Sequence, residues 1–95
     1  MKHGLADEVY EKIKDIIKDN KKHKIVLFGS RARGDYKKTS DIDLAVLDEM
    51  TRDEQYELMN KFDLLDTVYK IDIVFVDNNT KQELLQSINR EGIEF

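Results

Sequence analysis

Cysteine is absent from this 95-residue chain, and histidine occurs only twice, as His3 and His23. The absence of cysteine excludes a disulfide framework and catalysis by a thiol. Two histidines without cysteine do not make a zinc site of the usual kind. If the protein binds a metal ion, oxygen atoms must therefore supply its ligands.

Long apolar runs, proline-rich linkers and internal repeats are also absent. No run approaches the ~20 apolar residues that a membrane helix needs, and the first residues lead into a charged segment instead of a signal-peptide core. The charged fraction of 38% nearly equals the hydrophobic fraction of 40%, which favours a folded soluble domain over a disordered chain. We therefore expect one domain, residues 1–95, that is cytoplasmic and does not bind membranes.

An excess of positive charge is missing as well, because 20 acidic residues outnumber 16 basic ones and give a net charge of −4. Broad binding to nucleic acid usually requires a basic face, so we expect no stable nucleic-acid binding. The positive charge is local. One group lies near the end of the first predicted helix, where it complements the helix dipole: Lys18, Lys21, Lys22 and Lys24.

Hydrophobic periodicity predicts alternating helices and strands. Apolar residues at helical spacing indicate a first helix over about residues 4–20. Strands are expected at 24–28, 42–47 and 70–76, with a short helix beginning at Ser30 and a C-terminal tail, 93–95, that docks or adds a short edge. Two segments have the form of a capping box and predict further helices: Thr51-Arg52-Asp53-Glu54 and Thr80-Lys81-Gln82-Glu83.

The two later helices have predicted core faces. The apolar residues of the first are Tyr56, Met59, Phe62 and Leu65, and those of the second are Leu84, Leu85 and Ile88, followed by Gly92 as a helix stop. The first two strands are joined by a loop and are expected to run antiparallel, whereas a whole helix joins the second to the third, as a parallel crossover requires. The predicted fold is an α/β (α+β) domain with a small mixed sheet covered by helices.

Asp41 and Asp43 open the second predicted strand. Side chains two residues apart on a strand point the same way, so the two carboxylates should lie side by side. Such a pair suits Mg²⁺, and Asp72, between isoleucines in the third strand, is a third candidate ligand. Taken alone, an Asp-x-Asp at a strand start is more often a solvated turn. Its occurrence with a Gly-Ser turn and Asp72 at the same edge of the sheet favours a metal site.

Gly29 and Ser30 follow the first predicted strand and form the turn of a candidate phosphate site. Gly29 and Gly34 have the spacing of a P-loop, but Asp35 and Tyr36 stand where that motif needs Lys and Ser or Thr. The dinucleotide-binding pattern with three glycines is absent as well. The turn therefore belongs to neither of these phosphate-binding classes.

Gly29-Ser30, ten intervening residues, Asp41-Ile42-Asp43 and the later Asp72 resemble the signature of the DNA polymerase beta nucleotidyltransferase superfamily. More narrowly, the segments 29–34, 40–44 and 88–93 are similar to the minimal nucleotidyltransferases, or MNT proteins. The resemblance implies a polymerase-beta-like fold, two Mg²⁺ ions held by Asp41, Asp43 and Asp72, and ATP as substrate. It implies that the Gly29-Ser30 turn holds the triphosphate. Arg31 and Arg33 are candidate phosphate clamps, with Arg33 preferred and a solvated surface role equally open for Arg31.

The same resemblance implies a partner and a biological role. Because 95 residues leave little to support an acceptor, a second copy of the chain or a separate subunit is expected. In the family, that subunit is a HEPN ribonuclease toxin, and the MNT protein is an antitoxin that transfers AMP to a tyrosine of the toxin. The alternative is a non-catalytic antitoxin that neutralises its partner by occlusion. Transfer to RNA or an antibiotic is a weaker interpretation, because no basic platform or accessory domain is evident.

Overall fold

The computed structural model describes residues 2–95 and contains four helices and four strands within that range. The first half of the chain forms α1 (Asp7–Asp19), β1 (Ile25–Phe28), α2 (Ser30–Arg33) and β2 (Ile42–Val46). The second half forms α3 (Arg52–Asp63), β3 (Ile71–Phe75), α4 (Gln82–Glu91) and β4 (Ile93–Glu94). All the predicted elements are present, and most begin or end within a few residues of the expected positions.

The four strands form one mixed sheet in the order β3-β2-β1-β4. β1 pairs antiparallel with β2, and β2 pairs parallel with β3, as the connections predicted. The short strand β4 pairs antiparallel with β1, with Leu27 opposite Ile93, which confirms the docking of the C-terminal tail at an edge. β1 and β2 therefore occupy the middle of the sheet, where the Gly-Ser turn and the first two acids are attached.

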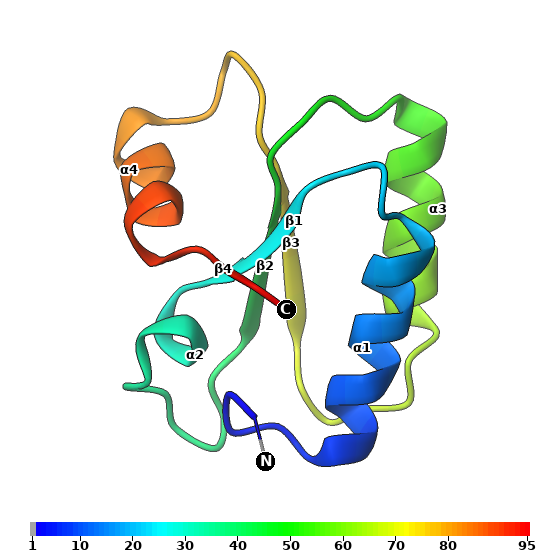
Figure 1. Ribbon diagram of the computed structural model, residues 1–95, viewed down its shortest axis with the longest axis vertical. Coiled ribbons are helices and arrows are strands. Elements are labelled where there is room, and N and C mark those ends of the chain that lie inside the picture. The colour runs from blue at the N-terminus through cyan, green and yellow to red at the C-terminus, as the bar shows by residue number, and fades with distance from the viewer. Residues whose placement is uncertain (1) are drawn as a thin grey trace.

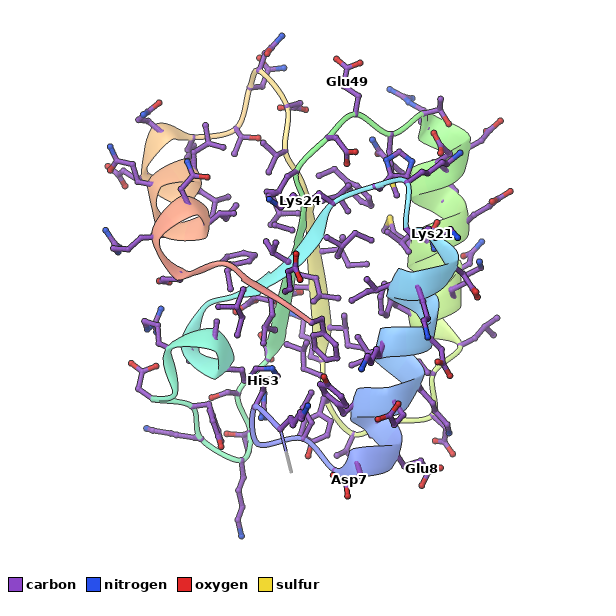
Figure 2. The ribbon with its side chains drawn as sticks, viewed as in Figure 1. His3, Asp7, Glu8, Lys21, Lys24 and Glu49 are labelled. Atoms are coloured by element: carbon purple, nitrogen blue, oxygen red, sulfur yellow. The ribbon has the colours of Figure 1, made fainter. Side chains whose placement is uncertain are left out.

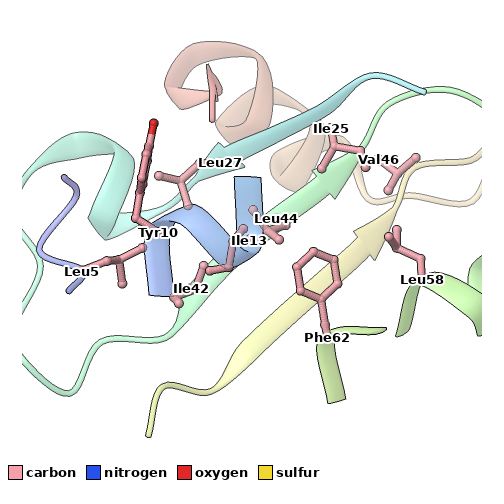
Figure 3. Packing of buried hydrophobic residues seen from close by; sticks show 10 residues of the cluster. All are labelled: Leu5, Tyr10, Ile13, Ile25, Leu27, Ile42, Leu44, Val46, Leu58 and Phe62. Carbon is pink, nitrogen blue, oxygen red and sulfur yellow. The ribbon is translucent and has the colours of Figure 1, made fainter. Parts of the chain in front are cut away.

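Helices cover the two faces of the sheet unequally. α1 and α3 lie side by side on one face, whereas α4 lies on the other (Figure 1). The larger core joins α1 and α3 to alternate residues of β1 and β2, among them Ile25, Leu27, Ile42, Leu44 and Val46 (Figure 3). A smaller core under α4 contains Val26, Phe28, Ala45 and Ile88. The alternation fixes which face each strand residue occupies.

The predicted core face of α3 is partly wrong. Tyr56 is 62% exposed and Met59 is 43% exposed, whereas Leu58, which the pattern analysis passed over, is buried together with Phe62. Leu58 and Phe62 are four residues apart and therefore share one face of the helix. The expected capping box is confirmed, because the Glu54 N–H donates to Thr51 Oγ1 and the Thr51 N–H donates to Glu54 Oε1.

The second predicted capping box does not form. Lys81 is the residue that precedes α4, and no side chain caps the helix there. Thr80 Oγ1 instead accepts a hydrogen bond from the Asp77 N–H at 2.9 Å, so this threonine stabilises the preceding turn. Gly92 does end α4, and its N–H donates to the carbonyl oxygen of Ile88, but its backbone is extended, not left-handed. Within residues 2–95, no helix has the length and apolar character required to cross a membrane.

Candidate nucleotide and metal site

Strand register brings two of the three predicted acids together. Asp43 in β2 is paired directly with Asp72 in the parallel strand β3. On its other side, Asp43 is paired with Phe28, the last residue of β1, which leads into the Gly-Ser turn. Asp41 lies one residue before β2 begins. The start of β2, the start of β3 and the end of β1 therefore meet at one edge of the sheet, here called the catalytic edge.

The turn after β1 lies against one of these acids. Gly29 has φ of +78° and ψ of −160°, a backbone conformation that residues other than glycine rarely adopt. A Cβ atom at this position would lie 2.5 Å from Oδ2 of Asp43. Glycine is therefore required twice here, by the backbone conformation and by the approach of the carboxylate. The turn therefore lies directly beside the acid.

The short helix α2 begins immediately after this turn. Its first internal hydrogen bonds run from the N–H groups of Ala32 and Arg33 to the carbonyl oxygen of Gly29. The N–H groups that precede Ala32, those of Ser30 and Arg31, are not used to close the helix, as is usual in a first turn. Ser30, the first residue of α2, is partly exposed.

The pKa of Asp43 is raised above its ordinary value. Partial burial is the main cause, and the negative charges of Asp72 and Asp41 act in the same direction, whereas the positive charge of Arg33 opposes them. Carboxylates that repel one another in this way are stabilised by a cation placed between them.

The carboxylates form an open site. Among residues 2–95, no three His, Asp or Glu side chains are arranged closely enough to hold a metal ion by themselves. Mg²⁺ commonly takes one or two protein carboxylates and completes its coordination with water and substrate phosphates, so Asp43 with Asp72 or Asp41 has the donor set that this ion accepts. A cation also lies beside these acids: Nζ of Lys70 is 3.8 Å from Oδ1 of Asp72.

The two arginines of the turn have different surroundings. Arg33 is exposed, and its guanidinium donates to Glu91 at 2.8 and 3.0 Å and to Asp35 at 3.2 and 3.3 Å. These carboxylates raise the pKa of Arg33, Glu91 more than Asp35. Arg33 therefore presents a fixed positive charge beside the catalytic edge, a position compatible with the role of a phosphate clamp.

Arg31 is buried, with 1% of its surface exposed, so the open interpretation of a solvated surface residue is wrong. Its Nε and Nη2 atoms donate to the Ser40 carbonyl at 3.1 and 2.9 Å, and Nη1 donates to the carbonyl of His3 at 2.9 Å. The rings of Tyr36 and Tyr69 lie 5.2 and 4.8 Å from the guanidinium. Because the side chain is committed to these partners, the structure gives no support to Arg31 as a phosphate clamp.

The contacts of Arg31 join distant segments at the catalytic edge. His3 lies in the N-terminal turn beside α2, as Figure 2 shows, and Ser40 immediately precedes Asp41. Lys21 and Lys24, from the predicted basic group, lie at the opposite end of the sheet from His3 (Figure 2). That basic group is therefore separate from the site around the acids.

Sequence patterns did not indicate the importance of Glu91, the last residue of α4. Its side chain is only 8% exposed and makes two contacts with Arg33. The available signal was the segment 88–93, which carried part of the resemblance but assigned no role to this acid. A carboxylate at the C-terminal end of a helix is electrostatically disfavoured, and this anomaly could have marked the position.

The structure combines a small mixed sheet with a Gly-Ser turn that lies beside aspartates on two neighbouring strands. This combination is that of the nucleotidyltransferase folds. Residues 11–95 match the family described as "Polymerase beta, Nucleotidyltransferase", and the chain belongs to this family. No curated protein sequence matches the chain. Among solved structures, a chain of a toxin-antitoxin complex with AMP-PNP is 32% identical, with a TM-score of 0.63, over 87% of this chain and 68% of the other.

A second similar structure is a mutant of the toxin-antitoxin MntA-HpeT, 30% identical with a TM-score of 0.64 over 96% of this chain and 72% of the other. These likenesses place the chain among the MNT-type members of the family. A nucleotidyltransferase from Sulfolobus solfataricus, described as putative, shares the fold at 20% identity, with a TM-score of 0.50 over 98% of this chain and 86% of the other.

Proposed function

We propose that this protein is a Mg²⁺-dependent nucleotidyltransferase that transfers AMP from ATP to a hydroxyl group of a partner toxin, with release of pyrophosphate, and thereby acts as an antitoxin. The observation that carries the proposal is the meeting of Asp43, Asp72 and Gly29 at one edge of the sheet. Phosphoryl-type transfer depends mainly on positioning and charge stabilisation, and this edge offers groups for both.

Each residue of the edge has a proposed role. Asp41 and Asp43 hold the metal ions, and Asp72 contributes a third ligand and orients or deprotonates the attacking hydroxyl. The turn at Gly29 and Ser30 holds the triphosphate through backbone N–H groups and the serine hydroxyl. When bound, Mg²⁺ would neutralise phosphate charge and favour ionisation of the attacking hydroxyl. Arg33 is the preferred side chain for a direct phosphate contact.

The substrate and partner are proposed from the similar structures. One contains AMP-PNP, an ATP analogue, bound in a toxin-antitoxin complex. Another toxin-antitoxin MntA-HpeT structure carries glutamate in place of two aspartates two residues apart, the spacing of Asp41 and Asp43 here. These structures support a partner toxin. From the resemblance to the MNT proteins, we propose that the toxin is of the HEPN type and that a tyrosine hydroxyl is the modified group.

The test is AMP transfer to the protein encoded beside this one. The wild-type protein, the Asp41→Asn/Asp43→Asn variant and the control Asp66→Asn, at an exposed position, are incubated with the partner, α-labelled ATP and Mg²⁺. We expect the partner to gain the mass of AMP with wild type and with Asp66→Asn, and to gain none with the double variant. Transfer by a folded double variant would refute the proposed role of the acids.

Neutralisation by occlusion is the second candidate. It is supported by the similar structures, which are described as toxin-antitoxin structures. The discriminating variant is Asp43→Asn, because it should remove transfer without altering the outer surface of the protein. If this variant binds and silences the partner as well as wild type does, occlusion is sufficient. If it binds but does not silence the partner, modification is required.

A further inference from the structure

Glu91 occupies a position that helix stability does not explain. It is the last residue of α4, where the helix dipole disfavours negative charge. Its carboxylate is also largely shielded from solvent, with 8% of the side chain exposed. A carboxylate in such a place costs stability unless a positive group and hydrogen bonds compensate for it.

Arg33, the last residue of α2, supplies that compensation. Nη1 of Arg33 donates to both carboxylate oxygens of Glu91, at 2.8 and 3.0 Å. The end of α4 and the short helix α2 lie on the same side of the sheet, although 58 residues separate them in sequence (Figure 1). The pair therefore ties the C-terminal helix to the turn that begins at Gly29.

The hydrogen bonds of Arg33 leave one nitrogen of its guanidinium, Nη2, available. Nη1 donates to Glu91, and Nε donates to Asp35. Among residues 2–95, no protein acceptor takes a hydrogen bond from Nη2 of Arg33. A planar guanidinium that is held through Nε and Nη1 can present the N–H groups of Nη2 in a fixed direction. A phosphate oxygen is the acceptor for which such a donor is suited.

We propose that Glu91 is a positioning residue that holds Arg33 in the orientation required to contact the phosphates of the nucleotide. The inference rests on the proposed function, because it requires a nucleotide at the catalytic edge. It adds α4 to the elements that form the site, beside the Gly-Ser turn and the three aspartates. Asp35 is the lesser partner, because its pairing with Arg33 is exposed and correspondingly weak.

Whether Glu91→Gln weakens or strengthens nucleotide binding distinguishes a positioning role of Glu91 from direct charge repulsion. Glu91 is negative and lies near a site for an anionic nucleotide, so direct repulsion alone predicts that Glu91→Gln strengthens nucleotide binding. Positioning predicts the opposite. We expect Glu91→Gln to weaken binding of AMP-PNP with Mg²⁺ on the order of tenfold, because a glutamine cannot hold Arg33 through a charged pair. Under turnover, KM for ATP should rise while kcat changes little.

The experiment is a double-mutant cycle measured by calorimetric binding of AMP-PNP with Mg²⁺. It compares wild type, Glu91→Gln, Arg33→Ala and the double variant, with Glu83→Gln, at an exposed position on the same helix, as the matched control. We expect Glu91→Gln to have no further effect once Arg33 is absent, and Glu83→Gln to change the Kd less than about twofold. Glu91→Asp, which keeps the charge but shortens the side chain, should show an intermediate loss and should fold even if Glu91→Gln does not.

The outcomes distinguish this inference from the proposed function. If wild type does not bind AMP-PNP, the nucleotide site itself is refuted. If wild type binds but Glu91→Gln and Glu91→Asp bind equally well or more tightly, the positioning role is refuted and the nucleotide site stands. An effect of Glu91→Gln that persists in the Arg33→Ala background would also overturn it, because Glu91 would then act without Arg33.

Discussion

The carboxylate of Asp43 lies against the backbone of Gly29, so closely that a Cβ atom at position 29 would fall 2.5 Å from Oδ2. Asp43 is on β2 and Gly29 directly follows β1, and the antiparallel pairing of β1 with β2 brings them together. The relationship couples the candidate phosphate turn to the candidate metal ligands. A change on either side is therefore expected to alter both.

Gly29→Ala should impair the site more than the fold. The φ of +78° at this position costs about 1–3 kcal/mol for a residue with a Cβ atom, and the new methyl group must displace the Asp43 carboxylate. Displacement of a catalytic group by about 1 Å can reduce the rate on the order of 100-fold. We expect a loss of AMP transfer of that order, measured on protein whose folding is checked by denaturant titration.

Gly34→Ala is the matched control for this prediction. Gly34 also has a positive φ, +96°, but an added Cβ atom would meet nothing within 4 Å. The variant should lose a similar amount of stability from backbone strain while it retains transfer. Equal losses of transfer in the two variants would show that backbone strain, and not the contact between Gly29 and Asp43, explains the result.

Arg31→Lys should destabilise the protein although it keeps the positive charge. A lysine cannot reproduce the fork of hydrogen bonds to Ser40 and His3 or the contacts of a planar guanidinium with the rings of Tyr36 and Tyr69. We expect the free energy of unfolding to fall by about 2–4 kcal/mol, measured by chemical denaturation.

The exposed Arg52 provides the comparison. Arg52→Lys should change the free energy of unfolding by no more than about 0.5 kcal/mol, as is usual for a surface substitution. If Arg31→Lys were equally mild, the buried hydrogen bonds of Arg31 would contribute little to stability, and its role would have to be sought in ligand binding.

Glu54 should make the stability depend on pH in acid. The capping hydrogen bond from Thr51, followed by contacts with His23 and Lys22, lowers the pKa of Glu54 from 4.5 to about 2. A lowered folded-state pKa means that this stabilisation is complete above about 4.5 and is lost as the pH falls toward 2. The free energy of unfolding, measured between pH 6 and pH 2, should therefore decline over this window.

In Glu54→Gln this contribution is absent at every pH. The gap in stability between wild type and variant should therefore narrow as the pH falls from 4.5 to 2. Glu57→Gln, at an exposed position on the same helix, is the control and should follow the wild-type curve. A constant gap between wild type and Glu54→Gln across the window would contradict the assignment of the lowered pKa to Glu54.

Local patterns predicted the elements well but the details of their packing less well. The apolar spacing located α3, yet it did not reveal that Leu58 is buried and Tyr56 exposed. The apolar residues of this helix lie on more than one of its faces, and only packing against the core decides which face is buried. In the same way, Thr80 matched a capping-box pattern but bonds to the turn at Asp77. A hydroxyl group has several local backbone partners, and the path of the chain decides among them.

The sequence by itself determined the local features of the candidate site and the type of sheet. These are a glycine-serine turn after one strand, aspartates two residues apart at the start of the next, and connections that require a mixed sheet. These follow from local geometry and loop length. Only the tertiary structure decided the register that pairs Asp43 with Asp72. It also separated two arginines of one motif, because residues two apart on a helix face nearly opposite directions, so Arg31 is buried while Arg33 reaches Glu91.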